Sequence, residues 1–317
     1  MKEAFVFKEF GHDKKVLIHT VNSILSEYQA DGYDLTVRQV YYQFVARDLF
    51  PDDRKWRQIK DTNKWVKDPN GTKNAEPNYK WLAEILTEAR MAGLIDWDMI
   101  VDRGRETVTP TTWKDPAEIV KAAADSFAVD KWKDQTNHVE VMVEKQALEG
   151  VLIPVCERLG IRFTANKGFS SASSMYEAGK RLLDYSLDGK TVWVLYLGDH
   201  DPSGIDMTRD VEERLNLFAG QAWVNVDRLA LNMDQIQGLN LPPAPAKITD
   251  SRSKGYIARF GNDSWELDAL EPRRLAGIVT DAVERLRDNI AWSDAVKREE
   301  SMRKELQAFA DSYPGGE

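Results

Sequence analysis

The sequence predicts an α/β protein in two parts, a helical N-terminal region followed by a mainly parallel sheet with C-terminal helices. Three observations predict it. Residues 15–92 contain segments with helical periodicity. After residue 139, apolar runs that fit strands alternate with helical segments, which is typical of βαβ units with right-handed crossovers. The stretch DKWKDQTNH between them is polar, so we place a domain boundary there and expect domains of residues 1–133 and 134–317.

The N-terminal region is expected to hold three helices and a strand. Thr36 is the expected N-cap of the second helix, and Gly93 is the residue that ends the third. The basic segment 51–78 is expected to be irregular. The four elements are helices over residues 15–29, 36–49 and 79–92 and a strand over residues 94–102. This order is typical of a winged helix-turn-helix, which places a helix against DNA, and an all-helical bundle is the alternative.

The C-terminal part is predicted to alternate strands with helices. Val192–Leu197 is a continuous apolar run, which indicates a strand buried on both faces of a parallel sheet. The expected strands cover residues 139–144, 161–166, 191–198 and 222–231, and the expected helices cover residues 145–160, 170–186 and 202–217. A Pro-rich loop, LPPAPAKITDSRSKGY, and two helices over about 271–289 and 292–312 complete the expected order.

Composition limits the classes of protein that fit. The chain has 317 residues and one cysteine, Cys156, which excludes an internal disulfide framework and a cysteine-cluster zinc site. Its four histidines lack the HExxH spacing of a zinc hydrolase. No apolar run reaches the roughly 20 residues of a membrane helix, and the N-terminus has no signal-peptide pattern. We therefore expect a cytoplasmic protein with no membrane partner.

One basic segment contrasts with the net charge of −9. Residues 54–80 hold eight basic and three acidic side chains, interleaved with Trp56, Trp65 and Tyr79. A local basic strip can attract a phosphate backbone even when the total charge is negative, and a solvated surface is the alternative. The residues expected to bind DNA are Arg54, Lys55, Arg57, Lys60, Lys64, Lys67 and Lys73.

Two aspartates follow the strand VWVLYLG directly, in the stretch GDHDPSG. Asp199 and Asp201 are two positions apart, so on an extended backbone they share a side while His200 points the other way. Asp201 followed by Pro202 is typical of an N-cap and a first helical residue. The pair therefore lies at the carboxyl end of a strand, where open α/β sheets bind ligands. The alternative is that Asp201 only caps the helix and Asp199 is solvated.

A third carboxylate, Glu144, ends the strand VEVMVE in the same way. Adjacent ends of parallel strands meet at one edge, where three carboxylates repel one another unless a cation neutralises them. Oxygen ligands suit Mg²⁺, which uses a few carboxylates together with water and phosphate. We therefore expect Mg²⁺, or Mn²⁺ in its place, at Glu144, Asp199 and Asp201. A salt bridge from Glu144 to Lys145 or to an arginine is the alternative.

The motifs VEK and GDHDPSG together resemble the Toprim domain of the topoisomerase VI A subunit and its meiotic double-strand-break relatives. In that family a glutamate on the first strand and a DxD motif on a later strand bind Mg²⁺, and Glu144, Asp199 and Asp201 match them. The stretch NKGFSS resembles the family's Gly-rich loop after the second strand. The resemblance implies a Toprim-type α/β domain.

The N-terminal half carries a second resemblance to the same family. TVRQVYYQFVARDLF is similar to the winged-helix segment that carries the nucleophilic tyrosine, and by position Tyr42 and Arg38 match that tyrosine and an arginine four residues earlier. Residues four apart share a helix face, and a guanidinium there favours phenolate or holds the scissile phosphate. Tyr41 fits the apolar stripe with Val37 and Phe44, so we expect Tyr42 to be exposed. Aromatic packing of both tyrosines is the alternative.

The resemblance implies a compact protein like the topoisomerase VI A subunit, which binds double-stranded DNA. It would cleave DNA by Mg²⁺-dependent transesterification and leave a 5′-phosphotyrosyl link. The family acts as a homodimer in which one chain's tyrosine faces the other chain's metal site, and its ATPase is a separate B-type subunit. This sequence has no GxxxxGK[ST] P-loop, so an ATPase would have to come from such a partner. A Toprim nuclease that uses water and a non-catalytic DNA-binding module are the alternatives.

Overall fold

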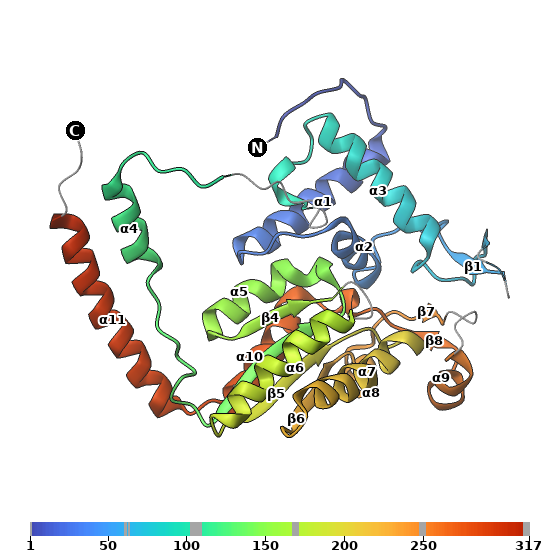
Figure 1. Ribbon diagram of the computed structural model, residues 1–317. Helices are drawn as coiled ribbons and strands as arrows, with labels where there is room; N and C mark the ends of the chain where they lie inside the picture. The colour runs from blue at the N-terminus through green and yellow to red at the C-terminus, as the bar shows by residue number, and fades with distance from the viewer. Residues whose placement is uncertain are drawn as a thin grey trace.

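The structure is a computed structural model of a mixed α/β protein, in which a four-stranded parallel sheet lies beside a cluster of N-terminal helices (Figure 1). The described residues are 2–59, 62, 64–101, 110–166, 171–246 and 252–312. No helix in these ranges is long and apolar enough to cross a membrane.

The sheet contains four strands in the order β4-β3-β5-β6, and all three pairings are parallel. The strands are β3 (Asn137–Val143), β4 (Arg162–Ala165), β5 (Thr191–Leu197) and β6 (Val224–Ala230). The central pair, β3 and β5, is buried along almost its whole length, as expected for strands covered on both faces. The prediction of a mainly parallel sheet is confirmed.

Helices cover both faces of the sheet (Figure 1). They are α5 (Glu149–Leu159) and α10 (Pro272–Leu286) on one face, and α6 (Ala172–Leu187) and α7 (Pro202–Ala219) on the other. On β3 the side chains alternate, because Val141 and Val143 pack toward α5 and α10 while Met142 packs toward α6 and α7. The sheet is therefore the middle of three layers.

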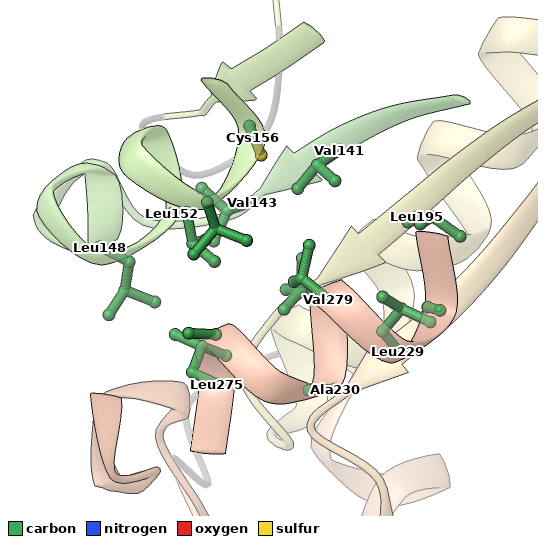
Figure 2. Packing of buried hydrophobic residues seen from close by; sticks show 14 of the residues in the cluster. Val141, Val143, Leu148, Leu152, Cys156, Leu195, Leu229, Ala230, Leu275 and Val279 are labelled. Atoms are coloured by element: carbon green, nitrogen blue, oxygen red, sulfur yellow. The ribbon is translucent and has the colours of Figure 1, made fainter. Parts of the chain in front are cut away.

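Figure 2 shows the core on the face of the sheet that α5 and α10 cover. Val143 of β3 lies against Leu152 of α5, and Leu275 and Val279 of α10 belong to the same cluster. Each of these side chains is at most 1% exposed. Burying one such side chain stabilises the fold by roughly 1.5–3 kcal/mol. This packing holds the carboxyl ends of the strands in place.

The N-terminal helices form a second core. They are α1 (His12–Ala30), α2 (Val37–Ala46) and α3 (Glu76–Met91), which share the apolar cluster with Phe10, Leu35 and Ile100. Thr36 caps α2 as predicted, in a capping box with Gln39. The helix ends at Ala46 rather than near Leu49, because the chain turns at Asp48, whose φ is 52°.

Two predictions for this region are wrong. The segment 51–78 is not irregular throughout, because β1 (Trp56–Gln58) and β2 (Trp65–Lys67) pair as an antiparallel hairpin. The stretch expected to be a strand holds the short 3-10 helix η1 (Trp97–Met99) instead. There the Asp96 side chain accepts a hydrogen bond from the Asp98 N–H, and this local turn interrupts the extended backbone.

The remaining elements link and extend these two cores. They are α4 (Pro116–Ser126), η2 (Gln146–Leu148), α8 (Met233–Leu239), β7 (Ala244–Pro245), α9 (Ser253–Phe260), β8 (Asp263–Ser264), η3 (Leu267–Ala269) and α11 (Asn289–Ser312). Figure 1 shows α4 and α11 side by side as an arm at one end of the molecule. Trp132, which precedes the expected domain boundary, packs in the sheet core and donates its indole N–H to Leu159 O at 2.7 Å.

Candidate functional site

The candidate site lies where the strand order changes direction. From β3 the chain moves to β4 on one side, and later returns to β5 on the other side. The carboxyl ends of β3 and β5 therefore flank a topological switch point, the usual ligand position in open α/β sheets. Glu144 directly follows β3, and Asp199 lies two residues beyond β5. The predicted meeting of these strand ends is confirmed.

Glu144 and Asp199 contact each other through the backbone. Glu144 Oε2 accepts a hydrogen bond from the Asp199 N–H at 2.9 Å, and both residues are buried, with 8% and 7% exposed. Gly204, at the start of α7, leaves room for this arrangement. A Cβ there would meet the Asp199 carbonyl oxygen and would lie 3.0 Å from Glu144 Oε2.

Asp201 has a different role in the structure. Its Oδ1 accepts a hydrogen bond from the Gly204 N–H at 2.6 Å, so Asp201 caps α7, and Pro202 is the first helical residue. Both parts of that prediction are confirmed. Among the described residues, no group of three or more His, Cys, Asp or Glu side chains is arranged to hold a metal. Asp201 Oδ1 is thus engaged by the helix N-terminus, and Glu144 Oε2 by the Asp199 N–H.

The cation at this site is a lysine. Lys145 Nζ lies 2.9 Å from Asp199 Oδ2, 3.1 Å from Asp268 Oδ2 and 3.2 Å from Glu266 Oε2. We call Asp199, Glu266 and Asp268 the acidic cage. Lys145 thus forms its ion pairs with the acidic cage. A salt bridge to Glu144 was the alternative that the sequence suggested. In the structure, the positive charge that faces these three carboxylates together is the Lys145 ammonium.

Nothing local in the sequence marks Glu266 and Asp268, because the strand just before them, β8, spans two residues and leaves no apolar run to detect. Their approach depends on a pairing of distant segments: His200 and Trp265 exchange backbone hydrogen bonds of 2.8 and 2.9 Å. The Leu267 N–H then donates to Asp199 Oδ1 at 2.8 Å. The only signal in the sequence is that Glu266 and Asp268, like Asp199 and Asp201, are spaced two apart.

A buried arginine also supports the loop after β5. Arg228, on β6, donates to the carbonyl oxygens of Gly198 at 3.0 Å, Asp199 at 2.6 Å and Gly204 at 3.1 Å. Because these acceptors are backbone oxygens, the guanidinium holds the loop in place through hydrogen bonds that leave the carboxylate oxygens unused. Arg228 and Lys145 together bring two positive charges to this edge of the sheet.

The ionisation of the carboxylates reflects this mixed environment. Burial raises the pKa of Asp199 to about 7; the Lys145 ammonium opposes this shift and the Glu144 carboxylate adds to it. Burial also raises the pKa of Glu144, although the hydrogen bond from the Asp199 N–H opposes the shift. Keeping these carboxylates ionised at the strand ends therefore costs free energy, and a bound cation or a proton would lower that cost.

Helix α2 brings Arg38 to the same place, because α2 packs directly against η3. Arg38 Nη1 forms an ion pair with Glu266 Oε2, and its guanidinium lies 5.2 Å from the centre of the Tyr79 ring. A pocket of about 300 Å³ opens beside this ion pair. Its lining residues are Arg38, Glu144, Lys145, Gln146, Ala147, Asn166 and Asp268. The two halves of the chain thus contribute to one pocket.

The expectation that Tyr42 is exposed is wrong. Tyr42 is 5% exposed and Tyr41 is 4% exposed, because both rings belong to the N-terminal core, where they pack edge to face with their centres 5.2 Å apart. The Tyr41 hydroxyl donates to Asn74 Oδ1 at 2.9 Å. Burial raises the pKa of the Tyr42 phenol well above its usual value, with Glu266 acting in the same direction. Lys145 and Arg38 oppose that shift, so Tyr42 borders the same charges as the pocket.

The basic segment is partly neutralised by acids just before it. Lys67 pairs with Asp53 at 3.0 Å, and Lys73, with 11% of its side chain exposed, pairs with Asp48 and Asp52. Arg57 pairs with Asp68 at 2.8 Å. Arg54 stacks over Trp81, Lys55 is half-buried and Lys64 is exposed. Lys60, which is expected to bind DNA, and residues 167–170 of the stretch NKGFSS lie outside the described residues.

Comparison with protein-family models, with curated proteins and with solved structures finds no match for this chain. The function must therefore be argued from the site itself.

Proposed function

We propose that this chain binds duplex DNA and cleaves it by transesterification through Tyr42, as a winged-helix and Toprim-type protein similar to the topoisomerase VI A subunit. One observation carries the proposal. Arg38 of α2 and Glu144 at the end of β3 line one pocket, although about 100 residues separate them along the chain. Lys145 also lines it, pairs with Asp199 at 2.9 Å and, like Arg38, acts on the pKa of the nearby Tyr42 phenol.

The proposed chemistry is a phosphoryl transfer to a phenol. The Tyr42 oxygen forms a bond to phosphorus as the phenol loses its proton. The bond from phosphorus to the 3′ oxygen breaks, and that oxygen takes up a proton, so the products are a 5′-phosphotyrosyl link and a 3′ hydroxyl. Arg38 would exchange the Glu266 carboxylate for the scissile phosphate, which it can hold through two parallel hydrogen bonds. Because Tyr42 is buried, DNA binding must first open the contact between α2 and η3.

Mg²⁺ or Mn²⁺ remains the proposed cofactor, with Glu144, Asp199 and Asp201 as its proposed ligands. The carboxylates as arranged do not hold it, since Asp201 caps α7 and Lys145 occupies Asp199. When bound, such an ion would stabilise negative charge on a phosphate. The resemblance also leads us to propose a homodimer on DNA and a separate B-type ATPase subunit as partners.

Hydrolysis is the second candidate function, and the burial of Tyr42 favours it. A phenol whose pKa is raised by burial is a poor nucleophile until it is uncovered, whereas the pocket is open to water. In that case Tyr42 would pack α2 against η3, and a water molecule would attack the phosphate. The basic residues of the β1–β2 hairpin would bind DNA in both transesterification and hydrolysis.

The test is a denaturing-gel assay for a protein–DNA adduct with Mg²⁺ or Mn²⁺ at matched DNA occupancy. Tyr42→Phe should abolish both the adduct and cleavage, and Tyr41→Phe, which retains the Tyr42 phenol, is the matched control. Asp199→Ala should also abolish cleavage. Cleavage that persists in Tyr42→Phe but not in Asp199→Ala would establish hydrolysis. Binding with no cleavage under any of these conditions would support the non-catalytic module.

A further inference from the structure

We propose that the Asn166 side-chain amide binds the edge of an adenine base that has left its stack, and that Asn166 thereby selects the DNA bound at this pocket. The proposal deepens the function proposed above and rests on it in taking DNA as the ligand. It concerns a base, whereas the tyrosine, the carboxylates and the basic hairpin all act on the phosphate backbone.

Asn166 directly follows strand β4, beside the end of β3. Its backbone N–H donates to Val143 O at 2.8 Å, which continues the pairing of the two strands and places Asn166 next to Glu144. Asn166 is also one of the residues that line the pocket of about 300 Å³. The sheet therefore fixes the backbone from which this side chain reaches the pocket.

The Asn166 side chain is buried without a protein partner. The residue is 6% exposed, yet its side-chain amide forms no hydrogen bond with any residue that the structure describes. An amide has two donor protons and an acceptor oxygen, and leaving them unpaired in a buried position costs free energy. Because Asn166 borders the pocket, those hydrogen bonds are left to water or to a ligand there.

The hydrogen-bonding groups that remain free on the pocket wall include two neutral amides. Arg38 pairs with Glu266, and Lys145 pairs with the acidic cage, so both cations of the pocket are already engaged. Gln146, the other amide on the wall, also forms no side-chain hydrogen bond with a described residue. A neutral ligand that carries a donor beside an acceptor suits these amides.

Adenine presents that pattern, since its amine lies beside a ring nitrogen and pairs with Asn or Gln through two parallel hydrogen bonds. Glu144 and Asp268 on the wall also favour a base that carries an amine. The volume is at the small end of the range for ligand pockets, about 300–1,000 Å³, which suits a single base. A side chain so deeply buried does not enter a DNA groove, so the base must unstack to reach it, most easily when unpaired.

The first test measures the binding of free nucleosides to the full chain by saturation-transfer NMR without metal. Deoxyadenosine should bind, and purine deoxyriboside, which lacks the amine, should bind at least about tenfold more weakly, as should thymidine. Asn166→Ala should bind deoxyadenosine at least about tenfold more weakly, and Asn262→Ala, which alters an exposed asparagine, is the matched control. Equal binding of deoxyadenosine and purine deoxyriboside, or unchanged binding by Asn166→Ala, would overturn the proposal.

The second test measures DNA affinity by fluorescence anisotropy in EDTA, with a duplex that carries one unpaired adenine, the same duplex with an unpaired thymine, and the fully paired duplex. The unaltered chain should bind the first about tenfold more tightly than the other two. Asn166→Ala should bind all three alike, with unchanged affinity for the paired duplex. Asn166→Leu, which fills the same space without hydrogen bonds, should behave in the same way and should unfold at no lower temperature, because it removes an unpaired buried amide.

The outcomes separate this proposal from the function on which it rests. DNA binding with no preference for the unpaired adenine, or with a preference that Asn166→Ala and Asn166→Leu both retain, overturns the role of Asn166 and leaves the proposed function standing. Absence of all DNA binding overturns the proposed function, and the nucleoside test then decides whether Asn166 binds adenine. No cleavage is measured, so failure of the Tyr42 chemistry changes neither result.

Discussion

Glu140 and Glu144 are four residues apart at strand β3, on the face covered by α6 and α7, and both are buried. Their surroundings are opposite. Arg181 donates to both oxygens of Glu140, at 2.9 and 2.8 Å, and His138 lies 3.1 Å from Oε1. These partners lower the pKa of Glu140 to about 2 despite its burial. At the strand end, burial raises the pKa of Glu144.

The difference separates a structural carboxylate from a candidate functional one. In mid-strand, one glutamate has its own guanidinium with matching geometry, so its charge is satisfied within the fold. At the strand end, four carboxylates share Lys145, Arg38 and backbone donors, and one oxygen of Asp268 accepts no hydrogen bond from any residue that the structure describes. Burial alone therefore does not mark a functional site; an unbalanced set of charges does.

The largest expected effect is the loss of stability when the ion pair between Arg181 and Glu140 is broken. Arg181→Leu leaves the Glu140 carboxylate buried without its main partner, which should lower the free energy of unfolding by about 3–5 kcal/mol. Urea denaturation at pH 7 measures it. Arg209→Leu is the matched control, because Arg209 pairs with acids on exposed helix surface and should change stability little. Equal losses in the two variants would contradict the contrast.

The next effect is a pH dependence. Because the folded-state pKa of Glu140 is about 2 and its unfolded value about 4.5, its ionised form stabilises the fold by about 3 kcal/mol above pH 4.5. That stability is lost as pH falls through 2. Glu140→Gln should therefore cost about 3 kcal/mol at pH 7 and less at pH 3.5. Denaturant unfolding across this range tests it, and a cost independent of pH would refute the assignment.

A third effect concerns the packing at the strand end. Gly204→Ala would press a methyl group on the Asp199 carbonyl and near Glu144 Oε2, and should cost about 1–3 kcal/mol. Gly277→Ala, in the middle of α10 with open space around it, should instead stabilise the fold by about 0.5–1 kcal/mol. Thermal unfolding compares the two, and the same sign for both would contradict this account.

The smallest effect has the opposite sign to that of Glu140. The folded-state pKa of Glu144 is raised, so its stabilising contribution is full below its unfolded pKa of 4.5 and is lost as pH rises through the folded value. Glu144→Gln should thus gain stability relative to the unaltered chain as pH rises. Parallel unfolding of Glu140→Gln and Glu144→Gln gives the two slopes, and slopes of the same sign would remove the distinction.

Much of the sheet and part of the site followed from local patterns. The apolar runs predicted β3 and β5, and the DP sequence predicted the cap by Asp201 and the start of α7 at Pro202. These features depend on residues close in sequence, whose preferences act on the backbone directly. The strand expected over residues 94–102 failed because an aspartate turn outweighed the apolar composition.

The exposure of Tyr42 could not be predicted in this way. Helical periodicity places Tyr41 on the apolar side of α2 and Tyr42 on the other side. It does not reveal that η3, more than 200 residues later in the chain, packs against α2 as well. Tyr41 and Tyr42 are consequently both buried, one by the N-terminal helices and the other beside the charges of Glu266 and Lys145.

By itself, the sequence determined the four strands of the parallel sheet and the two carboxylates that follow β3 and β5, because these depend on local apolar pattern and on where each strand stops. Only the tertiary structure decided which cation those carboxylates meet. The pairing of His200 with Trp265 brings Glu266 and Asp268 to Asp199, and Lys145 then pairs with all three carboxylates. The physical reason is that Coulomb interactions depend on distances in space, which residues far apart in the chain acquire only on folding.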